Sequence, residues 1–113
     1  MRPISKKVKE EVLSRKLICQ RKAVFNDHNC QGRITIEHVW TNSGKQIDKA
    51  WAMILLCEYA HSVGKYQFIG ILDKNKNRYI SLLQATKKDL DEFPRIKWST
   101  IRRYLEKKYG PIV

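Results

Sequence analysis

The chain has 113 residues, which is enough for one modest hydrophobic core but not for two independent ones. It carries 23 lysines and arginines against 11 acidic residues, a formal charge of +12, while 42% of the residues are hydrophobic and 10% are aromatic. This composition favours a folded nucleic-acid-binding domain over a disordered basic tail, although ribosomal and membrane-surface domains reach a similar charge.

The sequence predicts neither a signal peptide nor a membrane span. Its longest apolar run, residues 50–57, is far shorter than the roughly 20 residues that cross a bilayer. Three cysteines are an odd number in a chain without a secretion signal, so we expect free thiols or metal ligands rather than a disulfide framework. The cytoplasm is the expected compartment.

A basic amphipathic helix is predicted over residues 6–17, with Ser5 as its N-cap and Val8 and Val12 on its apolar stripe. Its charged face is expected either to be solvated or to contact phosphate, and the sequence leaves both readings open. Residues 19–32 are expected to form a loop because they contain several turn formers. The basic residues of this region expected to contact nucleic acid are Lys6, Lys7, Arg15, Lys16, Arg21 and Lys22.

Residues 33–40 alternate β-branched and polar side chains, which predicts a strand. Strict alternation places Glu37 and His38 on opposite faces of that strand. If both side chains serve one site, the strand must end, twist or bulge at this point.

The hairpin is completed by a polar loop over residues 41–49 and a short buried strand over residues 53–57. A helix predicted over residues 58–63 then carries His61 and ends near Gly64. An acid, two histidines and a hairpin therefore lie within one short stretch of chain.

The C-terminal part, residues 74–109, is predicted to be mainly helical. Residues 73–84 have the apolar spacing of a helix, with a strand over residues 78–82 as the alternative. Thr86 and Asp89 resemble a capping box that opens a short helix, and Ser99 is expected to cap a final basic helix. The residues of that last helix expected to contact nucleic acid are Arg102 and Arg103.

The histidines and the acid suggest phosphodiester hydrolysis. This reaction needs an activated water, a cation to neutralise charge at phosphorus and on the leaving oxygen, and a positive surface. An imidazole with its pKa near 6.5 suits the first role, and a carboxylate with a second histidine can hold a divalent ion. Against this, three histidines are ordinary for this length, and a lone strand histidine is more often structural.

The segment 19–65 resembles the HNH endonuclease family. Its first strand ends in the pair Glu37-His38, a Gly44-Lys-Gln turn follows, and a leucine-rich segment leads to Cys57 and then His61. The segment is also similar to small phage-type HNH proteins, for which the compartment would be the cytoplasm of the host cell.

This resemblance implies an α+β fold in a single domain, with a ββα-metal hairpin-helix core flanked by basic helices. It implies that His38 is a general base and that Glu37 and His61 bind one divalent ion, magnesium or manganese, with nickel or zinc as alternatives. The function that follows is a metal-dependent DNA endonuclease or nickase. The alternative is a non-catalytic DNA-binding module that keeps the fold, and a homodimer is left open.

Two departures from the family pattern stand out. The family asparagine falls at Ala52, so the group that orients the base is either missing or supplied by Asn42 or Gln46. Lys22 and Ala60 occupy two positions of the usual four-cysteine zinc knuckle. The replacement set has ligand types that suit a structural zinc, with buried thiols as the alternative, and consists of Cys19, His28, Cys30 and Cys57.

Several residues outside these motifs have two readings. Lys45 and Lys65 flank the expected site and are either phosphate contacts or surface lysines. Asp73 and Asn77 are expected to act as structural caps, unless the segment after His61 folds back onto the site. The three tryptophans are expected in the core rather than as base-stacking platforms.

Overall fold

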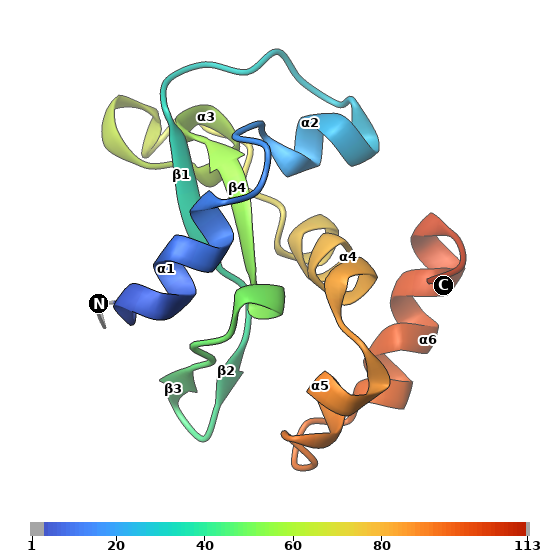
Figure 1. Cartoon of the computed structure of the whole chain (residues 1–113). Helices are drawn as coiled ribbons and strands as arrows, with labels where there is room; N and C mark the ends of the chain where they lie inside the picture. The colour runs from blue at the N-terminus through green and yellow to red at the C-terminus, as the bar shows by residue number, and fades with distance from the viewer. Residues whose placement is uncertain (1–3, 113) are drawn as a thin grey trace.

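An antiparallel pair of strands, β1 (Ile34–His38) and β4 (Met53–Cys57), forms the centre of the fold in the computed structural model (Figure 1), which describes residues 4–112. The register pairs Ile34 with Cys57 and His38 with Met53 without interruption. All five residues of β4 are buried because they are apolar, whereas β1 is half-buried throughout. The two-arm hairpin predicted from the sequence is therefore confirmed.

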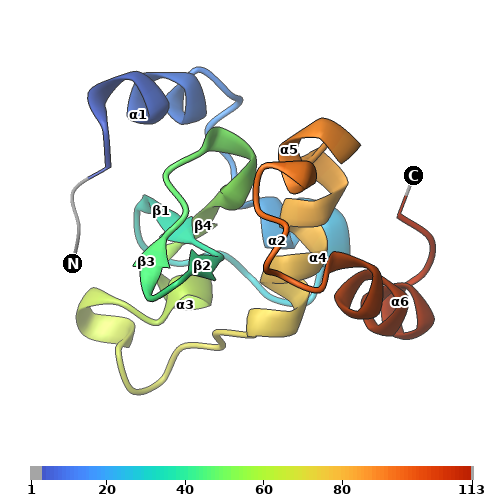
Figure 2. The same cartoon turned by 90° about the horizontal axis from the view of Figure 1, so that it is seen from below.

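Helices cover both faces of this strand pair (Figure 2). On one face, α1 (Lys6–Leu13) packs Val12 against Met53 and Leu55. On the other face, α2 (Gln20–Phe25) and α4 (Lys74–Gln84) cover Ile54 and Leu56, and Ile80 of α4 is buried among these side chains. Burying both faces of β4 explains its continuous apolar sequence. The mixed α+β class predicted from the sequence is confirmed.

The N-terminal third differs from the sequence prediction in two ways. Helix α1 ends at Leu13 rather than at residue 17, because Arg15 turns back to donate to the carbonyl oxygens of Ala50 and Met53 at 2.6 and 2.9 Å. Ser5 does cap the helix, accepting from the Val8 amide. The expected loop over residues 19–32 begins with the six residues of α2, a helix that is too short to be stable alone and is held by packing.

The connection between the central strands contains a small hairpin, β2 (Thr41–Asn42) and β3 (Lys45–Gln46), in place of a plain loop. Ser43 and Gly44 form its turn with φ of 53° and 79°, the left-handed conformation that tight hairpins need. A single 3-10 turn, η1 (Ala50–Ala52), then leads directly into β4.

The second half of the chain is helical, in the order α3 (Glu58–His61), η2 (Gly64–Tyr66), α4, α5 (Lys87–Asp91) and α6 (Trp98–Tyr109). The capping box of Thr86 and Asp89 is confirmed, and Asp73 caps α4 by accepting from the Lys76 amide. Helix α6 begins at Trp98, so the expected cap at Ser99 is wrong. No helix among residues 4–112 has both the length and the apolar character required to cross a membrane.

Helix α4 is fixed to the hairpin by buried hydrogen bonds that involve the tryptophans. The indole Nε1 of Trp40 donates to Ser81 Oγ at 2.9 Å, and that hydroxyl donates to the Trp51 carbonyl at 2.7 Å. Gln84 adds bonds to the carbonyls of Trp51 and Met53. Trp40 and Trp51 are 4% and 7% exposed, which confirms their predicted place in the core.

Candidate metal centres

A cluster of three cysteines and one histidine lies beside α2 and the end of β4. Cys19 immediately precedes α2, Cys57 is the last residue of β4, and the loop after α2 brings His28 and Cys30 to them. Their ligand atoms all lie within 4.8 Å of one another. The four residues predicted from the sequence are therefore together and close enough to hold a metal ion.

The distances within this cluster match tetrahedral coordination. Nε2 of His28 lies 3.6 Å from Cys19 Sγ, 3.6 Å from Cys30 Sγ and 3.5 Å from Cys57 Sγ. With Zn–S near 2.3 Å and Zn–N near 2.0–2.1 Å, a tetrahedral ion holds nitrogen and sulfur about 3.6 Å apart. The donor set fits zinc in both chemistry and size.

Asp27 orients the histidine of the cluster. Its Oδ1 lies 2.7 Å from His28 Nδ1, which leaves Nε2 directed at the three sulfur atoms. Its Oδ2 accepts from Arg21 and from Lys76 Nζ, the latter at 2.7 Å. Burial opposes ionisation, but the bonds from Lys76, His28 and Arg21 hold the pKa of Asp27 well below its usual range. Metal-bound histidines commonly have such a carboxylate partner.

Cys57 is suited to act as a thiolate ligand because of its place before α3. Burial raises its pKa, but hydrogen bonds from the backbone of Ala60 and Gln31, together with His28 and Cys30, bring the net pKa down to about 7. The Ala60 amide donates to Cys57 Sγ at 3.4 Å. Ala60 thus contributes to this cluster through its backbone amide.

A second pair of candidate ligands comes from β1 and α3. Nε2 of His61 is 3.5 Å from Glu37 Oε2. The hydroxyl of Thr35 donates to the Leu56 carbonyl at 2.8 Å, so its oxygen accepts the Nδ1 proton of His61 at 2.7 Å. In neutral His61, the Nε2 lone pair therefore faces a carboxylate oxygen.

Two acceptors that face each other need a cation between them, either a proton or a metal ion. Ligand oxygen and nitrogen atoms bound to one ion at about 2.1 Å lie about 3.0–3.4 Å apart. The 3.5 Å separation of Glu37 and His61 is close to this spacing. The pair fits two ligands of a divalent ion and leaves its remaining positions open.

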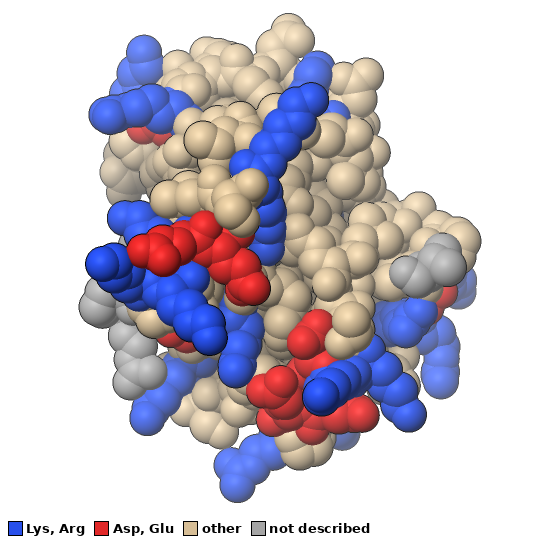
Figure 3. Space-filling view, viewed as in Figure 1, with Lys and Arg blue, Asp and Glu red and all other residues tan. Residues whose placement is uncertain are grey.

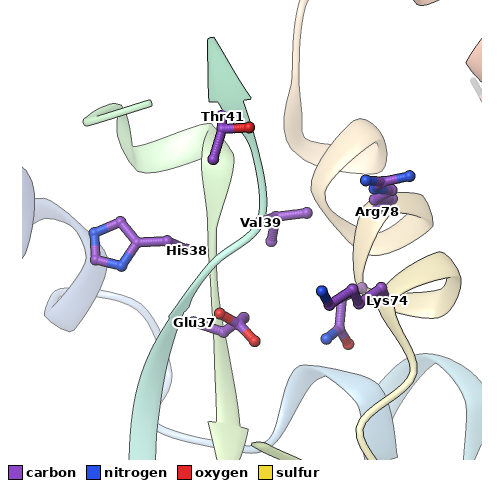
Figure 4. Close-up of a pocket in the computed structure, with 7 residues that line it drawn as sticks. Glu37, His38, Val39, Thr41, Lys74 and Arg78 are labelled. Carbon is purple, nitrogen blue, oxygen red and sulfur yellow. The ribbon is translucent and has the colours of Figure 1, made fainter. Parts of the chain in front are cut away.

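His38 does not join this pair. The uninterrupted register of β1 contains no bulge, so His38 leaves the strand on the face opposite Glu37, and its ring points away from Glu37 and Lys74 (Figure 4). Burial lowers the pKa of His38, and the charges of Glu37 and Asp48 partly offset this effect. Asn42 and Gln46 belong to the small hairpin, and among residues 4–112 neither is hydrogen-bonded to His38.

A pocket of about 270 Å³ opens beside Glu37, between β1 and α4. Its walls include Glu37 and Thr41 on the strand side and Lys74, Asn77 and Arg78 on α4 (Figure 4). The segment after His61 folds back and brings Asn77 to this pocket, which was one of the two interpretations of Asn77 that the sequence left open. Sequence reasoning missed Lys74 and Arg78, although their spacing of one helical turn was a usable signal.

The predicted nucleic-acid contacts fall into two groups. Arg21 must be removed from them, because it is 4% exposed and its guanidinium is bound to Asp27 and to the Ile71 carbonyl. Arg15 also has partners, because it donates to the carbonyls of Ala50, before β4, and Met53, in β4. Arg102 is paired with the carboxylate of Glu106. Lys22 is half-buried. The exposed residues of the set are Lys6, Lys7, Lys16, Lys45, Lys65, Arg102 and Arg103.

The face of the molecule seen in Figure 3 is not uniformly basic. Lysines and arginines are spread around it, and acidic side chains gather over α1 and α5. On α1 these acids are Glu10 and Glu11, and at α5 they include Asp91 and Glu92, all exposed. The net positive charge therefore does not form a single patch on this face.

Comparisons with protein-family models, with curated proteins and with solved structures gave no match to this chain. The resemblance to the HNH family rests on the sequence motifs alone. The four-residue cluster and the Glu37–His61 pair are observations on this chain itself.

Proposed function

We propose that the protein is a metal-dependent DNA endonuclease or nickase, with β1, β4 and α3 as its ββα-metal unit. The observation that carries this proposal is the 3.5 Å approach of His61 Nε2 to Glu37 Oε2, with the other ring nitrogen fixed by Thr35. A strand acid and a helix histidine that approach each other, with the acid lining an open pocket, fit the ligand arrangement that the sequence motif implies.

The reaction would be hydrolysis of a phosphodiester. A water oxygen attacks phosphorus and gives its proton to a base, the bond to the 3′ oxygen breaks, and that oxygen takes a proton from solvent. A divalent ion held by Glu37 and His61 would supply Lewis-acid stabilisation of the charge that develops on phosphate. Magnesium or manganese suits the carboxylate, and the imidazole also admits nickel or zinc.

His38 is our candidate for the base. Strand β1 is paired to β4 along one edge, and its other edge pairs with no strand among residues 4–112. A phosphate in the pocket beside Glu37, which His38 also lines, would lie near both side chains. Burial lowers the pKa of His38, which favours the neutral imidazole that can accept a proton.

We also infer that Cys19, His28, Cys30 and Cys57 hold a structural zinc. Support comes from the tetrahedral spacing and from the Asp27 partner of His28. Four protein ligands leave no open position, which is typical of structural rather than catalytic zinc. The metal would join the loop after α2 to the end of β4.

Nicking of supercoiled plasmid DNA tests the catalytic proposal. Purified protein should convert supercoiled to relaxed circles when magnesium, manganese or nickel is added, and should not do so in the presence of a chelator. Absence of nicking with all three ions would contradict the enzyme proposal.

The base assignment has its own test. His38→Ala should lower the rate of nicking by about 10²–10⁴-fold, the usual contribution of a general base, while DNA affinity changes little. Thr100→Ala, exposed on α6 and not among the residues that line the Glu37 pocket, serves as the control, and thermal unfolding shows whether His38→Ala remains folded. Nicking by His38→Ala at the wild-type rate would remove His38 from the mechanism.

A non-catalytic DNA-binding module is the second candidate. It is favoured by the orientation of His38 away from Glu37 and by alanine at position 52. This candidate predicts that the protein binds duplex DNA but leaves plasmid intact with every metal. Measuring binding and nicking on the same preparation separates the two functions, and sedimentation with DNA reports whether a homodimer forms.

A further inference from the structure

The wall of the Glu37 pocket that belongs to α4 carries two unpaired cations. Lys74 and Arg78 are one helical turn apart and both line the pocket. Neither forms an ion pair with a carboxylate within residues 4–112. The Arg78 guanidinium lies 5.3 Å from the centre of the Trp40 ring, a cation–π contact that limits its motion.

Asn77 lies between these cations on the same wall. Its residue exposure is 2%, and its Oδ1 is buried without a hydrogen-bond partner in the described part of the chain. Leaving such a group unpaired costs about 1–3 kcal/mol, so nearly all buried polar groups have partners. An amide kept at the pocket wall despite this cost points to a ligand that supplies the missing partner.

The α4 wall is held in place independently of any ligand. Ser81, one turn after Asn77, takes part in the buried hydrogen bonds that join Trp40 to the Trp51 carbonyl. Gln84, one turn further on, is bonded to Trp51 and Met53 of the hairpin. Because α4 is anchored in this way, the pocket groups are oriented before a ligand arrives, which favours binding.

The size and charge of the pocket define the ligand. Its volume of about 270 Å³ is below the roughly 300–1,000 Å³ typical of pockets for drug-sized molecules, so it suits one small group rather than a nucleobase. Two cations and an amide face it from α4, and Glu37 faces it from β1 (Figure 4). A divalent ion on Glu37 would offset that carboxylate and leave the pocket attractive to a small anion.

We propose that this pocket binds a backbone phosphate of nucleic acid, with Lys74 and Arg78 as a cationic clamp and Asn77 as the group that orients the phosphate or its water. The inference deepens the proposed function, on which it rests, because it names the residues that seat the scissile phosphate beside Glu37. Asn77 also places a side-chain amide at the site from α4, whereas the hairpin has alanine at position 52.

The clamp is tested with two double variants of equal charge change. Lys74→Gln/Arg78→Gln should weaken binding to a short DNA duplex and reduce the slope of log affinity against log salt concentration by about 2. It should also lower the nicking rate by about 10²-fold. Lys87→Gln/Lys88→Gln on α5, both exposed, removes the same charge away from the pocket and should leave the nicking rate unchanged.

Three outcomes of this experiment overturn the clamp: equal loss of DNA affinity in both double variants, no loss in either, or no DNA binding by the wild type. If the wild type binds DNA but never nicks it, the nuclease proposal fails. The clamp is then still decided by the affinity and salt slope of the two variants.

Asn77 is tested with Asn77→Leu, a replacement of similar size. If the amide serves a ligand, the variant should keep or raise the unfolding temperature, because an unpaired polar group is removed, and lose at least about tenfold in nicking rate or DNA affinity. Asn77→Ala is made alongside it in case leucine disturbs packing. Wild-type nicking and affinity in a folded variant would remove Asn77 from the site.

Discussion

The two candidate metal centres of this protein differ in how completely the chain surrounds them. The cysteine cluster offers four ligands, and Cys19, Cys57 and the His28 side chain are 4%, 0% and 3% exposed. The other centre offers only Glu37 and His61, with side chains 19% and 16% exposed beside a pocket. A closed ligand set favours a structural role for the metal, and an open set leaves room for a substrate.

Loss of a ligand of the cysteine cluster should have the largest effect on metal binding and on stability. We expect Cys30→Ser to abolish stoichiometric zinc binding and to lower the free energy of unfolding by roughly 3 kcal/mol or more, because metal binding is coupled to folding. Cys30 is exposed, so an ordinary thiol there would tolerate serine within about 0.5 kcal/mol. Elemental analysis and urea unfolding measure both quantities.

Asn29→Ser is the control for this variant, since Asn29 is an exposed neighbour in the same loop and is not a ligand. It should keep the metal content and the unfolding midpoint of the wild type. Less than a small fraction of one zinc per wild-type chain, purified without added metal, would show that the cluster consists of ordinary thiols.

We expect Asp27→Asn to cause an intermediate loss of zinc affinity. The carboxylate fixes His28 through a 2.7 Å contact, and loss of such a partner usually costs 10–100-fold in metal affinity, about 1.4–2.8 kcal/mol. Competition with a chromophoric chelator measures the affinity. Lys76→Gln, which removes another partner of Asp27 but leaves the His28 contact, should retain zinc far better.

The smallest of these effects should come from Thr35→Val at the open centre. This variant keeps the shape of the side chain but removes the acceptor of the His61 Nδ1 proton, so manganese affinity should fall by about tenfold while zinc content stays unchanged. Manganese binding can be followed by electron paramagnetic resonance. Thr100→Val, on the exposed face of α6, is the matched control; an equal fall in both variants would argue against a metal ligand at His61.

The sequence predicted best those features that depend on local patterns. The apolar run Met53–Cys57, the spacing of α4 and the capping box at Thr86 each follow from nearby residues, and the structure contains all three. Side-chain alternation also placed Glu37 and His38 on opposite faces. The four residues of the cluster were grouped by ligand type, as a replacement for the incomplete knuckle that the resemblance implies, with buried thiols as the alternative.

The features that the sequence missed depend on tertiary packing. Helix α2 lies among turn-forming residues and is stabilised by contacts with β4 and α4 that no local pattern reveals. Arg21 looks like any exposed basic residue until Asp27 is placed against it. Lys74 and Arg78 join the site only because α4 folds back beside β1, and that arrangement depends on the buried bonds of Ser81.

Asp27 also links distant parts of the chain, since Lys76 lies 49 positions away from it. Closing so long a loop costs conformational entropy. A metal that first joins the loop after α2 to the end of β4 would lower the entropy cost of the later contact between Asp27 and Lys76. We therefore expect metal uptake to come before α4 docks against β1. A chain without a metal in the cysteine cluster would then lack a fully formed Glu37 pocket, because Lys74, Asn77 and Arg78 line that pocket only when α4 lies beside β1.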